Sequence, residues 1–227
     1  MKIIEIKNLH KIYNGSSVSV HAVNGVDLTI EEGEFTAIVG PSGSGKTTLL
    51  NVIGGLDDAT EGSVIIDNVN IEKLSSRKLT DFRMKNIGFV FQAYNLIPVF
   101  TAKENVEFIM HLQGQKKADR EARTTELLQA VGLGDMMDRR PSKLSGGQQQ
   151  RVAVARALAS KPKFVLADEP TANLDSKSTE NLLDIMEKLN REEKITFIFS
   201  THDQRVVNKA RRVITLEDGK IINDLIK

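Results

Sequence analysis

Cysteine and tryptophan are both missing from the 227-residue sequence, and aromatic side chains make up only 5% of it. Without cysteine there can be no disulfide framework, which fits a reducing compartment. No stretch comes close to the roughly 20 consecutive apolar residues of a membrane-spanning helix. Basic and acidic residues nearly cancel, 31 against 30, so the net charge gives no reason to expect nucleic acid as a partner. We therefore expect a cytoplasmic protein that reaches a membrane only through another chain.

What the sequence does contain is an alternation of strand-like and helical patterns. Two strand-like runs at 3–13 and 18–30 are joined by a hairpin signal at 14–17. Strands that are apolar throughout and alternate with helices indicate a parallel sheet buried on both faces, and hence an α/β fold. Further strands are predicted at 35–39, 63–71, 87–91, 164–168 and 195–200, and a hairpin over 210–224 turns around 217–219.

Residues 93–160 show a helical period instead. The string TAKE at 101–104 is a capping box that opens one helix, and a second helix is predicted over 118–131, before Gly132. We expect this stretch to form a helical subdomain. It would be inserted into a single domain whose other parts are 1–92 and 161–227.

The string GPSGSGKT follows the predicted strand 35–39 and opens a predicted helix. It fits the phosphate-loop pattern G-x-x-x-x-G-K-[ST]. Glycine allows backbone conformations in which successive amides point at phosphate oxygens, and the helix N-terminus adds partial positive charge. Lys46 is expected to bridge the β- and γ-phosphates, and the Thr47 hydroxyl to bind Mg²⁺. The nucleotide-binding residues predicted here are Gly40, Pro41, Ser42, Gly43, Ser44, Gly45, Lys46, Thr47 and Thr48.

Two carboxylates end the predicted strand 164–168, in the string FVLADEP. Ligands of open α/β sheets bind at the carboxyl ends of the strands, so Asp168 is expected to hold the Mg²⁺ shell and Glu169 to polarise the attacking water. Because adjacent carboxylates repel each other, burying both without a metal would be costly, which argues against a purely structural role. The string NKAR at 208–211 lacks the aspartate of the guanine-recognition element N-K-x-D, which disfavours a GTPase.

The string LSGGQQQRVAVARAL at 144–158 is predicted to be a helix that opens with a serine and two glycines. A glycine inside a helix costs roughly 1 kcal/mol relative to alanine. The segment has no obvious catalytic group of its own. Its glycines therefore need an explanation from the rest of the chain.

Taken together, these motifs resemble those of the nucleotide-binding subunits of ABC transporters, along nearly the whole length of the chain. The shared elements are the phosphate loop, LSGGQ at 144–148, LADEP at 166–170 and NLD at 173–175, together with Gln92, His202 and Tyr13. The resemblance implies a P-loop NTPase core of the RecA type, with an N-terminal antiparallel β subdomain and the helical insert. It also implies hydrolysis of ATP with Mg²⁺ as cofactor.

In that family the signature serine and glycines bind the γ-phosphate of the ATP held by a second subunit, in a head-to-tail dimer. The resemblance therefore places Ser145, Gly146, Gly147 and Gln148 against the nucleotide of a partner subunit, and it makes dimer closure depend on ATP. Physically, this is a helix N-terminus offered to an anion, with amides made accessible by glycine. That role would explain the glycines.

Four more roles are implied by the resemblance, most of them beside a plainer alternative. Tyr13 stacks on adenine, or is simply a strand aromatic. Gln92 contacts Mg²⁺ and the attacking water and links the site to the helical insert, or merely ends its strand. His202 contacts the transition state, or is structural, and Asp175 reaches across the dimer. The implied catalytic set is Glu169, His202, Gln92 and Lys46.

Within the family, the absence of a coiled-coil insertion and of a second cassette favours a subunit coupled to a membrane permease over a soluble ATPase that acts on DNA or ribosomes. The segment 89–106 resembles the lipoprotein-releasing and macrolide-exporting group; a cell-division ATPase that works without transport is the alternative. The permease would hold the chain at the inner face of the plasma membrane. Residues 93–103 would receive the permease through Tyr94, Leu96 and Phe100, unless these side chains fill the domain's own core.

Overall fold

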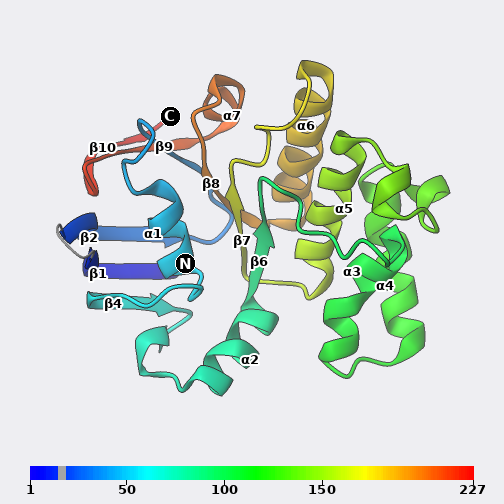
Figure 1. Ribbon diagram of the computed structural model, residues 1–227, viewed down its shortest axis with the longest axis horizontal. Helices are drawn as coiled ribbons and strands as arrows, with labels where there is room; N and C mark the ends of the chain where they lie inside the picture. Colours follow the sequence, from blue (N-terminus) through cyan, green and yellow to red (C-terminus); the bar gives the residue numbers. More distant parts are fainter. Residues whose placement is uncertain (15–18) are drawn as a thin grey trace.

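The computed structural model describes residues 1–14 and 19–227, so most of the hairpin turn predicted at 14–17 lies outside the described residues. The strands form two separate sheets (Figure 1). They are β1 Lys2–Asn14, β2 Ser19–Glu31, β3 Phe35–Val39, β4 Glu61–Ile66, β5 Val69–Asn70, β6 Ile87–Val90, β7 Phe164–Asp168, β8 Thr196–Ser200, β9 Arg212–Glu217 and β10 Lys220–Ile226.

The first sheet is antiparallel, with the strand order β2-β1-β4-β5. The second sheet has the order β10-β9-β3-β8-β7-β6; its strands run parallel except for β10, which pairs antiparallel with β9. The predicted α/β fold is confirmed: this is a P-loop NTPase fold with an antiparallel N-terminal sheet. The closing hairpin is confirmed as well, because β9 and β10 turn at Asp218 and Gly219.

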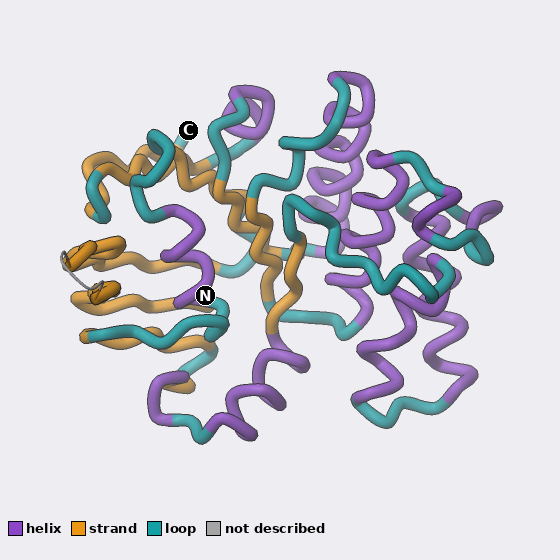
Figure 2. Tube along the Cα trace, in the orientation of Figure 1, coloured by secondary structure: helices purple, strands orange, loops and turns teal. Residues whose placement is uncertain are grey.

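Most of the helices lie on one side of the molecule (Figure 2). There α3, α4 and α5 follow one another between β6 and β7, beside α6. The α-helices are α1 Lys46–Ile53, α2 Ser76–Asn86, α3 Ala102–Leu112, α4 Lys117–Ala130, α5 Gly146–Ala159, α6 Ser176–Glu193 and α7 Gln204–Lys209, and short 3₁₀ turns occupy Ile71–Lys73, Gly134–Met136 and Pro141–Lys143. The capping box of Thr101 and Glu104 is confirmed at the start of α3. A subdomain made of 93–160 stays a prediction.

The central strands are apolar along their whole length because both of their faces are buried. On β7, Val165 packs into the core shared with the helices α3 to α6, whereas its neighbour Leu166 packs into the core shared with α1 and the antiparallel sheet. On β8, Phe197 and Ile198 divide in the same way. A parallel sheet covered on both sides needs this residue pattern, which explains why its strands could be predicted.

Two expectations about the elements need correction. The predicted strand 63–71 is in fact a hairpin, because Asp67 and Asn68 adopt positive φ angles of 47° and 64° between β4 and β5. Two successive left-handed residues are typical of a tight type I′ turn, which Asp and Asn tolerate well. Helices α2 and α7 are also present although the sequence analysis had not predicted them. Among the described residues, no helix combines the length and apolar character needed to cross a bilayer.

Candidate active site

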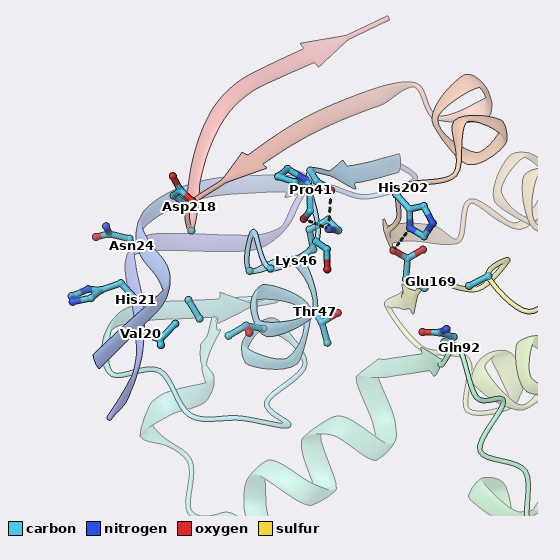
Figure 3. A pocket seen from close by; sticks show the side chains of 18 residues that line it. Val20, His21, Asn24, Pro41, Lys46, Thr47, Gln92, Glu169, His202 and Asp218 are labelled. Carbon is cyan, nitrogen blue, oxygen red and sulfur yellow. Dashed lines mark hydrogen bonds and ion pairs between the residues drawn. The ribbon is translucent and has the colours of Figure 1, made fainter. Parts of the chain in front are cut away.

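A cleft of about 1020 Å³ opens where parallel strands of the second sheet end (Figure 3). The phosphate loop follows β3, Glu169 follows β7, and His202 lies just beyond β8. These three strands are direct neighbours, so their carboxyl ends bring the three segments together. The cleft is lined by Val20, His21, Ala22, Asn24, Gly40, Pro41, Ser42, Gly43, Gly45, Lys46, Thr47, Thr48, Gln92, Glu169, Ala172, His202, Asp218 and Gly219.

The phosphate loop is held between main-chain atoms of two other segments. A Cβ atom at Gly40 would collide with the carbonyl oxygen of Leu216, and one at Gly45 would collide with that of Ala22. Gly45 has φ +99°, a conformation that favours glycine. The loop is therefore fixed in shape by backbone on both sides, which prearranges its amides for an anion.

Lys46 is 8% exposed, and its amine lies inside the turn of the loop. Nζ donates to the carbonyl oxygens of Gly40 at 2.9 Å and of Pro41 at 2.8 Å. These contacts keep the positive charge in the hollow that the loop surrounds. Of the other predicted loop residues, Ser44 is buried and does not line the cleft.

Thr47 and Asp168 form the part of the site that suits a magnesium ion. The Thr47 hydroxyl lies 2.9 Å from one carboxylate oxygen of Asp168 and 3.1 Å from the other, and the Gln92 amide lines the same cleft. These are hard oxygen donors of the kind that Mg²⁺ prefers. No cluster of three or more His, Cys, Asp or Glu side chains suited to a metal occurs in the described ranges, so the ion would also need oxygens from a nucleotide.

Glu169 and His202 face each other at the other end of the cleft from the β1–β2 hairpin (Figure 3). The Nδ1 atom of His202 lies 2.8 Å from Oε1 of Glu169. Glu169 itself has a φ of 45°, the left-handed region that is uncommon outside glycine. This turn of the backbone separates its carboxylate from that of Asp168, so two adjacent acidic residues serve different partners.

Tyr13 is not among the residues that line the cleft. Its hydroxyl donates to Oδ2 of Asp57 at 2.6 Å, and the Lys11 amine lies 4.9 Å from its ring centroid. Burial, together with the hydrogen bond to Asp57, raises the pKa of Tyr13. Stacking of its ring on adenine stays a prediction.

The end of the cleft that lies away from Glu169 was not predicted from the sequence. Val20, His21 and Asn24 from β2 line it, together with Asp218 from the closing hairpin. The Asn24 amide donates to the Gly219 carbonyl at 2.9 Å, which holds the two hairpins together. No local pattern marks these residues, because only tertiary packing brings them to the phosphate loop.

The signature residues lie in a different place. Ser145 caps α5, and its hydroxyl accepts from the Gln148 amide at 3.3 Å while the Gln148 side chain accepts from the Ser145 amide at 2.9 Å. Together with Gly147 they border a second cavity of about 230 Å³, whose other lining residues are Arg151, Lys177, Ser178 and Asn181. This cavity has no lining residue in common with the phosphate cleft. Within one chain, the signature and the phosphate loop are therefore not brought together.

The signature glycines also have a packing role inside the chain. A Cβ at Gly146 would lie 2.8 Å from the Tyr94 hydroxyl, and one at Gly147 would lie 2.8 Å from Oγ and 2.9 Å from Cβ of Ser178. Glycine thus lets Tyr94 and the start of α6 approach α5 closely. Asp175 caps α6 by accepting from the Ser178 amide at 2.9 Å and from its hydroxyl at 2.7 Å, which lowers the pKa of Asp175. A role for Asp175 across a dimer stays a prediction.

The segment predicted to receive a permease packs partly against its own chain. Tyr94, Leu96 and Phe100 are each half-buried; Leu96 packs against the helical core, and the Phe100 ring meets that of Phe108 at 5.5 Å. Their neighbour Val99 is 69% exposed. These three side chains therefore serve the fold, and a docking role for them stays a prediction.

Comparison with known proteins places this geometry in context. Residues 23–172 match the family described as ABC transporter. An ABC transporter ATP-binding protein of Thermotoga maritima is 47% identical, over 97% of this chain and 94% of its own. The macrolide export ATP-binding/permease protein MacB of Mannheimia succiniciproducens is 46% identical over the whole chain, which spans only 35% of its length.

A solved structure is also closely similar. The ATP-binding cassette MJ0796 of Methanocaldococcus jannaschii, described as a dimer in a post-hydrolysis state bound to ADP and Pi, superposes with a TM-score of 0.91 at 44% identity. The similarity covers 99% of this chain and 98% of that one.

Proposed function

The chain belongs to the ABC transporter family and is an ATPase of that family, and from this premise we propose that it works as a head-to-tail dimer closed around two ATP molecules. In this dimer the phosphate loop of each copy would hold one nucleotide. The signature of the opposite copy would cover its γ-phosphate. Hydrolysis would remove those contacts and let the dimer open, which turns ATP turnover into movement.

The positions of the side chains support the following roles in the cleft. Lys46 and the loop amides would bind the β- and γ-phosphates. Thr47, Asp168 and Gln92 would hold Mg²⁺, which when bound offsets the negative charge of the phosphates. Glu169 would accept the proton of the attacking water. His202, 2.8 Å from the Glu169 carboxylate, would keep that base oriented and contact the γ-phosphate.

The observation that best supports this proposal is the separation of the two cavities. The phosphate cleft and the cavity at Ser145 have no lining residue in common. A single copy thus offers a phosphate site without a signature, and a signature without a phosphate site. A second copy placed head to tail would complete both.

Complementation between two inactive variants tests the proposal directly. Lys46→Ala removes phosphate binding and leaves the signature intact, whereas Ser145→Arg blocks the signature and leaves the phosphate loop intact. Each variant alone is expected to lose ATP turnover. Mixing them should restore part of the activity, because each mixed dimer then contains one site built from two intact halves.

The control is the sum of the two separate rates at the same total protein concentration. Activity of the mixture above that sum requires a site shared between copies. A mixture no more active than the sum, or a Ser145→Arg variant that binds ATP poorly as a monomer, would refute the in-trans arrangement. Measurement of MgATP binding to each variant separates these outcomes.

We further propose that the chain powers a transporter of the lipoprotein-releasing and macrolide-exporting type, bound to a permease at the inner face of the membrane. Support comes from the 46% identity to the macrolide export protein over the whole chain. We expect the neighbouring reading frame to encode a four-helix permease with a large extracytoplasmic domain. A neighbour without transmembrane helices, or a permease that fails to co-purify with this chain, would contradict this assignment.

A further inference from the structure

The backbone at Glu169 requires support from its surroundings. Its φ of 45° is unfavourable for a residue with a side chain. Such conformations persist only where neighbouring contacts fix them, and they occur often at functional sites. Three residues outside the lining of the cleft link the Glu169 side chain to the turn that follows Glu169.

These residues are Thr171, Thr201 and Asp203, which we call the hydroxyl clamp. The Thr201 hydroxyl donates to Oε2 of Glu169 at 3.3 Å and accepts from the Asp203 amide at 3.0 Å. The Thr171 hydroxyl donates to Oδ2 of Asp203 at 2.9 Å. The chain of contacts runs from the Glu169 side chain to Thr171, two residues after Glu169, and so ties the turn after β7 to the turn after β8.

The direction of each hydrogen bond is set by the donors available. A threonine hydroxyl has one proton, and the hydroxyl of Thr201 already accepts the amide hydrogen of Asp203. Its proton is therefore directed at the Glu169 carboxylate. Arg205, paired with Asp203 at 2.8 Å, lowers the pKa of Asp203 and keeps it an acceptor for Thr171.

The two threonines of the clamp are enclosed, and Asp203 is half-buried. Thr171 is 2% exposed and Thr201 is fully buried, and neither lines the phosphate cleft. Hydrogen bonds made by buried hydroxyls hold their partners in one geometry more firmly than exposed ones, because water competes less for them. The backbone of Glu169 adds one more restraint, since its amide donates to the Ser200 carbonyl at 2.8 Å.

We propose that the hydroxyl clamp is a set of positioning residues that holds the Glu169 carboxylate in the orientation needed to accept a proton from the attacking water. This inference rests on the proposed role of Glu169 as the base. The clamp also links Glu169 to the segment that carries His202, so both groups are fixed by the same contacts. Loss of the clamp should slow the chemical step without weakening ATP binding.

The test replaces hydroxyls by methyl groups of the same shape. Thr201→Val should lower kcat roughly ten- to a hundredfold, the effect of losing a hydrogen bond to a charged group, while the ATP dissociation constant stays unchanged. Thr201→Ser keeps the hydroxyl and should recover most of the rate. The matched control is Thr196→Val, because Thr196 is a fully buried threonine at the start of β8, the strand that Thr201 follows, and its hydroxyl accepts from the Gly33 amide at 2.8 Å.

A second variant covers the case in which Thr201→Val does not fold. Thr171→Val breaks the clamp at its other end and should give the same separation between kcat and ATP affinity. If the three residues act as one unit, the double variant of Thr171 and Thr201 should lose little more than the worse single variant. Losses in kcat that simply multiply would show that the two threonines act separately and would refute the clamp.

Other outcomes distinguish this inference from the proposed function. If Thr201→Val and Thr171→Val turn over ATP like Thr196→Val while Glu169→Gln is inactive, the clamp is wrong and Glu169 remains the base. If Glu169→Gln itself keeps wild-type turnover, the proposed function fails first. A lower rate for Thr201→Val that Thr201→Ser does not rescue would mean that shape matters rather than the hydroxyl, and would also overturn the clamp.

Discussion

Asp168 and Glu169 are sequence neighbours with the same charge and different surroundings. Asp168 ends β7 in extended conformation, 2.9 Å from the Thr47 hydroxyl, whereas Glu169 turns into the left-handed region and meets His202. One change of backbone conformation thus gives one carboxylate to the Thr47 hydroxyl and the other to His202. At this scale the chemistry depends on a single φ angle.

Glu169→Gln should abolish most turnover, because an amide cannot accept the proton of the attacking water. We expect kcat to fall about a hundredfold or more, as for loss of a general base, while ATP still binds. The bound ATP should then hold two copies together, which size-exclusion chromatography with and without MgATP would detect. A variant that turns over near the wild-type rate, or elutes as a monomer with MgATP, would contradict the prediction.

Site residues that follow the central strands were predicted from the sequence, whereas those that the two hairpins contribute were not. The phosphate loop, Asp168, Glu169 and His202 all sit at strand ends, so a correct strand prediction also brought them to one edge of the sheet. His21, Asn24 and Asp218 reach the cleft through packing between two hairpins, which no local pattern encodes. The hydrogen bond of Tyr13 to Asp57 was not predicted, because Asp57 lies in a segment distant in sequence, and stacking of the Tyr13 ring on adenine stays a prediction.

At the scale of the element, the start of α5 is packed against two neighbours. Tyr94 lies over Gly146, and Ser178 at the start of α6 lies over Gly147. A methyl group added at Gly146 would meet the end of a side chain, whereas one added at Gly147 would meet a Cβ atom close to the backbone of α6. Alanine at these two positions should therefore have different effects.

Gly147→Ala should lower the free energy of unfolding by about 1–3 kcal/mol, the usual range for overpacking. Ser178→Ala should not rescue it, because the Ser178 Cβ would still lie 2.9 Å from the new methyl group. Gly146→Ala should cost less, and the added substitution Tyr94→Phe should restore stability by removing the hydroxyl. Urea denaturation of the single and double variants measures these couplings. Equal losses for both alanine variants, or rescue of Gly147→Ala by Ser178→Ala, would contradict this packing.

Prediction of elements from the sequence worked where burial imposed a pattern. Strands β7 and β8 are apolar on both faces, and α3 and α4 carry caps or apolar stripes. Helix α2 was missed because it has no fully buried residue and so shows no apolar stripe. Its half-buried residues are Leu79, Phe82, Arg83, Met84 and Asn86. The hairpin at Asp67 was missed because its apolar residues continue on both sides of the turn.

At the scale of the whole molecule, Arg212 joins the two sheets. Its guanidinium donates to the Thr29 carbonyl of the antiparallel sheet at 2.8 Å and to both carboxylate oxygens of Asp224 on β10, at 2.8 and 2.7 Å. It also pairs with Glu34 at 3.0 Å. One side chain therefore links β2, the start of the central sheet and the last hairpin.

This link makes stability depend on pH. The hydrogen bond from Arg212 lowers the pKa of Asp224, so the pair stabilises the fold fully above the ordinary carboxyl pKa of about 4 and loses that contribution as pH falls through the lowered value. Asp224→Asn should destabilise the protein by at most about 1 kcal/mol at neutral pH, since Asp224 is partly exposed, or about 2–4 °C in Tm. The difference from wild type should vanish at low pH in thermal unfolding. A constant difference down to pH 2 would contradict it.

The surroundings of the glycines have a consequence for suppressor genetics. Gly40 and Gly45 are confined by the carbonyl oxygens of Leu216 and Ala22, which belong to the main chain and remain whatever codon is changed. Gly146 is confined by the hydroxyl of Tyr94, which a single base change can remove. A selection for revertants should therefore recover only true reversions at the phosphate loop. At the signature it should also yield compensating changes at Tyr94.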